Sequence, residues 1–340
     1  MVKDRYNWSI AISRIAATVL ILLCHLFSKI GLGWIGSIFD VGVPIFLIIS
    51  GFLYGGGQNR ISDIKIFFWK RWCRICVPMY IWLTVVVVSY CLQKDYKVLK
   101  AVPIFLFNLQ GIGWIQDFWS VPSIGDIGIL WFLTIIYICY LLLPVIDYYF
   151  DKLESFWGFK ILLVGIIFML NYLGIHLSYF LSFIIGYWLG RKRILIRGKK
   201  ECITLCVITL LCQVFRLLMR KFFDDTVIYN YIVVYISHTV LAYFIMVIID
   251  NVTYLVEKAN RFSGFFQYVI RQVDSLSIYI YIVHYTFLTG VLAVNKIIHS
   301  YIFWIPLWIA QTIIGAIILK KLSDCVLNND LICKFEHYKK

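Results

Sequence analysis

The feature that most constrains this chain is a series of apolar segments, most of them about 20 residues long, separated by polar loops. An α-helix rises about 1.5 Å per residue, so about 20 apolar residues are needed to cross a hydrocarbon core of about 30 Å. Apolar residues make up 62% of the 340 residues and charged residues only 15%. A soluble domain has about 25% charged residues. The sequence therefore predicts an all-α polytopic membrane protein.

We expect about ten transmembrane helices in one bundle. Their predicted ranges are 8–28, 38–56, 76–92, 128–147, 160–175, 178–190, 201–218, 231–249, 275–293 and 301–320, of which 160–175 and 178–190 are short. No soluble module or internal repeat is evident, so residues 1–340 are interpreted as a single membrane domain with a tail at about 321–340. No heptad seam or clear GxxxG span indicates an oligomeric state.

The net charge of +14 comes mainly from loops between the apolar segments. With the N-terminus in the cytoplasm, the basic stretches at 60–74 and 191–200 and the C-terminal tail all fall inside, as the positive-inside rule requires. We therefore expect both termini to be cytoplasmic, an even number of spans, and a place in the plasma membrane. The partner of the basic residues is then the anionic lipid leaflet and not nucleic acid.

The cysteines do not suggest a metal site. All ten are scattered, and the single CxxC, formed by Cys73 and Cys76, has no second pair of cysteines or histidines with it. We expect these side chains to fill apolar space.

Two ionisable residues, Arg14 and His25, lie within the first apolar segment, which lacks a signal-peptide cleavage site. Eleven residues at 100° each bring the second side chain to about 20° from the first, about 16 Å along the helix. Charged groups in hydrocarbon are costly and usually face a cavity with a function. Arg14 and His25 are therefore expected to share one polar path.

The second helix returns past this path. In an antiparallel hairpin, Asp40 lies near the depth of His25 and Ser50 near the depth of Arg14. Asp40 could hold the imidazole of His25 in one tautomer and raise its basicity, or it could cap the outer end of its own helix.

Other polar residues leave two interpretations open. His284, midway along the ninth segment, could face the cavity or hydrogen-bond to a neighbouring helix, and His238 is a weaker case of the same kind. Arg216 is expected to extend outward to the membrane surface. Arg71 and Arg74 are three residues apart on a helix and would form a fork suited to phosphate, although a positive-inside anchor would look the same.

Several of these features together resemble one known family. They are Arg14 and His25 with ten residues between them, GVPIFLIISGFLYG at 42–55, KRWCR at 70–74, LWFLTIIYICYLLLP at 130–144 and IYIVHY at 280–285. In this order they are similar to acyltransferase family 3, membrane proteins that O-acetylate bacterial surface polysaccharides. Larger members carry a glutamate shortly after the LWFL-like segment, and residues 134–140 here have no carboxylate.

The resemblance implies a ten-helix bundle that binds acetyl-CoA from the cytoplasm. His25 would be catalytic with Arg14 as its partner, and Asp40 is the candidate acid. Arg71 and Arg74 would bind CoA phosphates, while the pantetheine arm passes Arg14 and Ser50. His284 and Trp131 are assigned to the acceptor. No metal is expected.

The predicted reaction is transfer of an acetyl group to a hydroxyl of a cell-surface or capsular polysaccharide or its lipid-linked precursor. His25 would act as general base or as nucleophile. The competing classes are a transporter or polymerase of polysaccharide or lipid-linked glycan and a non-catalytic scaffold. Neither paired broken helices nor related halves, which are common in transporters, are evident.

Overall fold

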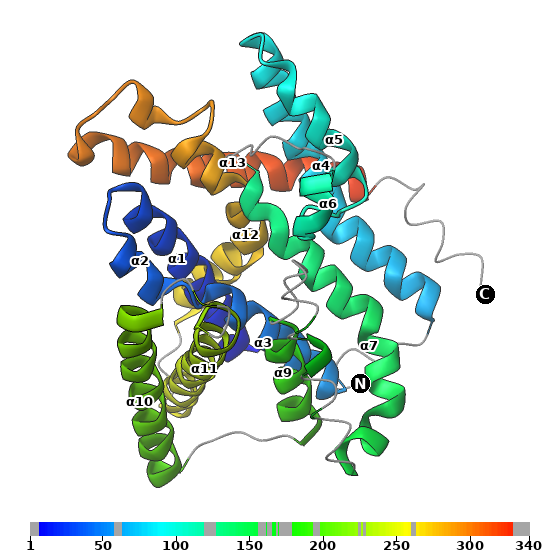
Figure 1. Cartoon of the computed structure of the whole chain (residues 1–340), viewed down its shortest axis with the longest axis vertical. Coiled ribbons are helices and arrows are strands. Elements are labelled where there is room, and N and C mark those ends of the chain that lie inside the picture. The colour runs from blue at the N-terminus through cyan, green and yellow to red at the C-terminus, as the bar shows by residue number, and fades with distance from the viewer. Residues whose placement is uncertain are drawn as a thin grey trace.

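The computed structural model describes residues 7–57, 63–118, 127–155, 179–192, 198–223, 229–259 and 263–328, with 161, 165–167, 169 and 226. Its regular elements are helical (Figure 1). The α-helices are α1 (Trp8–Lys29), α2 (Gly33–Phe39), α3 (Gly42–Gly55), α4 (Ile64–Leu92), α5 (Val102–Leu106), α6 (Gly113–Phe118), α7 (Trp131–Ser155), α9 (Phe180–Lys192), α10 (Lys199–Phe223), α11 (Val234–Lys258), α12 (Gly264–Thr289) and α13 (Tyr301–Leu327).

Within the described residues, eight helical segments are long and apolar enough to cross a membrane. They overlap eight of the predicted ranges, with α2 and α3 together forming the second crossing. The range 178–190 corresponds to α9, whose 13 residues are short for a full crossing. The range 160–175 lies largely outside the described residues, as does 329–340 of the predicted tail. The chain is thus a multi-pass membrane protein, and the count of ten stays a prediction.

Short polar residues set the starts of three helices around the site. The side chain of Asn7 accepts a hydrogen bond from the backbone N–H of Ile10 at the start of α1. Asp63 caps α4 and Ser263 caps α12 in the same way. Such caps satisfy backbone donors that have no partner inside the helix, so they fix where each helix begins.

Glycines let α3 and α9 approach each other closely. Gly51 and Gly55 on α3 face Gly186 and Gly190 on α9, and a Cβ at any of the four would overlap the backbone of the opposite helix. Both pairs have the GxxxG spacing that permits such contact in membranes. This spacing was not expected from the sequence, and in the structure it joins two helices of the same chain.

The helices α1 and α12 lie side by side and run in the same direction. At one end Arg14 forms a salt bridge with Asp274, and at the other the ring of His25 lies 5.3 Å from that of His284. This pairing brings together the first and the last third of the chain.

The last helix, α13, packs antiparallel to α12. Near its start Trp308 donates to the backbone carbonyl of His284 at 3.0 Å, and near its end Lys320 donates to the hydroxyl of Ser275 at 2.7 Å. The start of α1 and the end of α13 therefore lie at the same end of the bundle. The even number of crossings and the cytoplasmic side of the termini stay predictions.

Candidate active site

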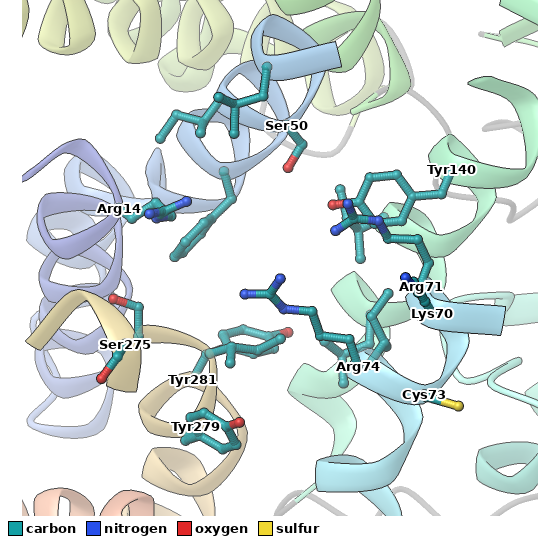
Figure 2. Close-up of a pocket in the computed structure, with 18 of the residues that line it drawn as sticks. Arg14, Ser50, Lys70, Arg71, Cys73, Arg74, Tyr140, Ser275, Tyr279 and Tyr281 are labelled. Atoms are coloured by element: carbon teal, nitrogen blue, oxygen red, sulfur yellow. The ribbon is translucent and has the colours of Figure 1, made fainter. Parts of the chain in front are cut away.

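A cavity of about 820 Å³ lies at the end of the bundle where α1 begins and α13 ends (Figure 2). Residues of α1, α3, α4, α7, α12 and α13 line it. An excess of one charge sign in a cleft favours ligands of the opposite sign, and here the excess is positive. The charged side chains are Arg14, Lys70, Arg71, Arg74, Arg271 and Lys320, with Asp274 and Asp324.

The predicted donor residues Arg14, Ser50, Arg71 and Arg74 all line this one cavity. Ser50 comes from α3 and the last two arginines from α4, so three helices from the first 92 residues contribute (Figure 2). The structure therefore brings these four residues together as the sequence analysis expected, although no bound donor tests their role.

Arg71 is surrounded by aromatic rings. Its guanidinium carbon lies 5.3 Å from the ring centre of Tyr54, 5.6 Å from that of Phe67 and 5.2 Å from that of Tyr140. Ring faces attract cations and restrict the side chain to few conformations. Arg71 is thus held in place by its aromatic neighbours.

Arg74 differs from the other arginines of the cavity. Figure 2 shows its guanidinium extending into the middle of the cavity, between Arg14 and Arg71. Among the described residues it has neither a hydrogen-bond nor an ion-pair partner. A guanidinium without such a partner can donate two parallel hydrogen bonds to a phosphate or carboxylate.

Arg14 forms a bidentate salt bridge that the sequence analysis missed. Its Nε and Nη2 donate to the two carboxylate oxygens of Asp274 on α12, each at 2.7 Å. The predicted range of that span began at residue 275, so Asp274 was counted as part of a loop. The pair neutralises much of the charge of Arg14 and ties α1 to α12.

His25 lies further along α1, beyond the cavity. Its ring centre is 4.8 Å from that of Tyr285 and 5.3 Å from that of His284, and it is not among the residues that line the cavity. Tyr281 does line the cavity, its ring lies 6.0 Å from that of His284, and its hydroxyl donates to the carbonyl of Ile129. Tyr281 therefore lies between the cavity and the histidines.

Comparison with protein families decides the class of protein. The acyltransferase 3 family model, described as "Acyltransferase domain", matches residues 7–320. The chain belongs to the acyltransferase 3 family. Comparisons with curated proteins and with solved structures gave no match. The resemblance found in the sequence is confirmed.

In this acyltransferase the pairing of Asp40 with His25 stays a prediction. Among the described residues the two form no hydrogen bond. Arg216 on α10 has a buried side chain that donates to Gln213 at 3.1 Å and to the carbonyl of Ser37 at 3.4 Å. The expectation that Arg216 extends outward is therefore wrong, because these acceptors hold it inside.

Trp131 of the acyltransferase is not among the residues that line the basic cavity. Trp131 begins α7 and stacks on Tyr179, with ring centres 5.4 Å apart, and Tyr179 in turn contacts Tyr235 edge-on. The acceptor role of Trp131 stays a prediction. The described residues contain no group of three or more histidine, cysteine, aspartate or glutamate side chains that could hold a metal ion.

Proposed function

We propose that this membrane acyltransferase moves an acetyl group from acetyl-CoA to a hydroxyl of a cell-surface polysaccharide or its lipid-linked precursor. The observation that carries the proposal is the cavity with its excess of basic side chains, into which the unpaired guanidinium of Arg74 extends. Coenzyme A is an anion with several phosphates, and its volume suits a site of several hundred cubic ångströms. Family membership supplies the acyl-transfer class.

The arginines of α4 would bind the donor phosphates. Arg74 offers unpaired N–H groups, and Arg71 is oriented by its three aromatic neighbours. Guanidinium groups bind phosphate oxygens through short, charge-assisted hydrogen bonds. The uncharged pantetheine arm would then run along the apolar wall formed by Phe46 and Phe132 towards Tyr281.

In the proposed reaction His25 is the general base. It takes the proton of the acceptor hydroxyl while the oxygen attacks the carbonyl carbon of the thioester. The C–S bond then breaks, and the leaving thiolate takes the proton from the imidazolium to give free CoA. Alternatively, a ring nitrogen of His25 attacks the thioester carbonyl, the C–S bond breaks and CoA leaves as the thiolate. The acceptor hydroxyl then attacks the acetyl-imidazole, its proton goes to the thiolate, and the C–N bond breaks to free His25.

This proposal places the basic cavity on the cytoplasmic side of the plasma membrane. The basic residues of α4 and α13 then face the compartment that holds acetyl-CoA, as the positive-inside rule favours. The acceptor would approach His25 from the opposite direction. This arrangement keeps the soluble donor and the surface glycan on separate sides.

The test is acetyl transfer by the detergent-purified protein from labelled acetyl-CoA to a glycan acceptor, comparing wild type with His25→Ala. Transfer by wild type and its loss in the variant is the expected result. If the protein neither binds nor consumes acetyl-CoA, the proposal is overturned. Movement of labelled lipid-linked glycan without acetyl-CoA would instead indicate a transporter.

A further inference from the structure

The tautomer of His284 is set by its own helix. Its side chain is fully buried, with 0% exposure, and Nδ1 lies 2.8 Å from the carbonyl oxygen of Tyr281 and 3.2 Å from that of Ile280. A carbonyl oxygen only accepts hydrogen bonds, so Nδ1 must carry the proton. In the neutral ring Nε2 then has a lone pair and accepts. This buried Nε2 has no hydrogen-bond partner among the described residues.

Buried acceptors are nearly always satisfied, so a lone pair without a partner needs an explanation. His25, on the parallel helix α1, has a ring nitrogen that could supply the missing N–H, because the two ring centres are only 5.3 Å apart. An N–H···N bond of about 2.9 Å needs no more than a side-chain rotation at that separation.

The surroundings hold His284 in place for this contact. Trp308 donates to its backbone carbonyl at 3.0 Å, and two residues further along α12 the hydroxyl of Thr286 accepts from Trp82, also at 3.0 Å. Three helices, α4, α12 and α13, are fixed to each other around this ring. The position of Nε2 is therefore preorganised, and His25 is the ring that adjusts to it.

We propose that His284 is the positioning residue of His25: its Nε2 accepts the N–H of the His25 ring, so the other His25 nitrogen keeps a lone pair directed at the acceptor hydroxyl. This inference rests on the proposed function. The neutral imidazole of His284 would then orient His25, a role that carboxylates perform in many acid/base sites. A neutral partner suits this location because a carboxylate in an apolar interior is costly.

Two substitutions separate the nitrogens of His284. In His284→Asn the side-chain amide keeps a donor near the position of Nδ1 and loses the acceptor at Nε2. In His284→Gln the amide oxygen can lie near the position of Nε2. The matched control is His238→Asn on α11, a histidine that is also buried (1% exposed) and lies outside the proposed site.

The experiment measures steady-state acetyl transfer and the thermal stability of each purified variant. We expect His284→Asn to lower kcat by about 10² to 10⁴-fold, the range for loss of an acid/base function, with the KM for acetyl-CoA unchanged. His284→Gln should recover kcat to within about tenfold of wild type. His238→Asn should keep kcat.

Two results would overturn this inference while leaving the proposed function intact. One is a wild-type kcat in His284→Asn. The other is an equal loss in His284→Asn and His284→Gln together with equally lowered melting temperatures, which would mean a purely structural role. Absence of acetyl transfer by wild type would overturn the proposed function, and the inference with it.

Discussion

The salt bridge between Arg14 and Asp274 should be energetically coupled, and a double-mutant cycle can measure the coupling. The perturbations are Asp274→Asn, Arg14→Gln and the two together. Each single substitution removes one charge and keeps a similar shape, so the partner is left without its counter-charge. The double variant removes both charges and restores a neutral pair.

The magnitude follows from geometry and exposure. The two hydrogen bonds measure 2.7 Å each, and the side chains of Arg14 and Asp274 are 33% and 8% exposed. Exposed pairs contribute about 0.2–1 kcal/mol, whereas removing one partner of a buried pair costs about 3–5 kcal/mol. This pair lies between these limits, so each single substitution should lower the free energy of unfolding by about 2 kcal/mol.

The assay is unfolding in mixed detergent micelles followed by tryptophan fluorescence, with a second cycle as control. Arg191 and Asp147 form a looser pair, 3.7 Å apart and 41% and 55% exposed, so the cycle of Arg191→Gln and Asp147→Asn should give a coupling below about 1 kcal/mol. If the two effects at Arg14 and Asp274 add to within about 0.5 kcal/mol, the claim that this pair joins α1 to α12 is refuted.

Three further predictions address the donor, the helix contact and the proposed base. Arg74→Gln should raise the KM for acetyl-CoA about 10- to 150-fold, since a charge-assisted hydrogen bond contributes about 1.5–3 kcal/mol, and an unchanged KM would remove Arg74 from the donor site. Gly186→Ala should lower the free energy of unfolding by about 1–3 kcal/mol, because the added Cβ would overlap the backbone of α3. The control Gly33→Ala should be nearly neutral, because the space around Gly33 is open, and equal effects of the two substitutions would contradict this packing. Asp40→Asn should lower kcat less than about tenfold, because Asp40 forms no hydrogen bond with His25 among the described residues. A loss as large as that of His25→Ala would support the dyad.

Much of the fold could be predicted from the sequence because the bilayer imposes a length and a composition on each crossing. Eight of the predicted ranges coincide with apolar helices in the described residues. The periodicity of α1 also placed Arg14 and His25 on one side of the helix, and both now contact α12. These properties depend only on neighbouring residues in the chain and on the surrounding lipid.

The pairing between helices could be predicted only in part. Ser50 was expected at the depth of Arg14, and the two residues do line one cavity. However, equal depth does not mean equal direction around a helix, and the equal depth of Asp40 and His25 gives no hydrogen bond among the described residues. The glycines of α3 and α9 carried a readable GxxxG signal that was overlooked. Asp274 was missed because the helix begins earlier than the hydropathy pattern indicated.

What the sequence determined by itself is therefore a multi-pass helical membrane protein of this acyltransferase family with a basic end. What only the tertiary structure decided is which polar groups meet: Arg14 with Asp274, 260 residues apart, Arg71 with its three aromatic rings, and His25 with His284. The physical reason is that lipid and helix interiors are similarly apolar, so hydropathy places a helix in the membrane without selecting its neighbours. Close packing and hydrogen bonds between helices make that selection, and they exist only once the bundle has formed.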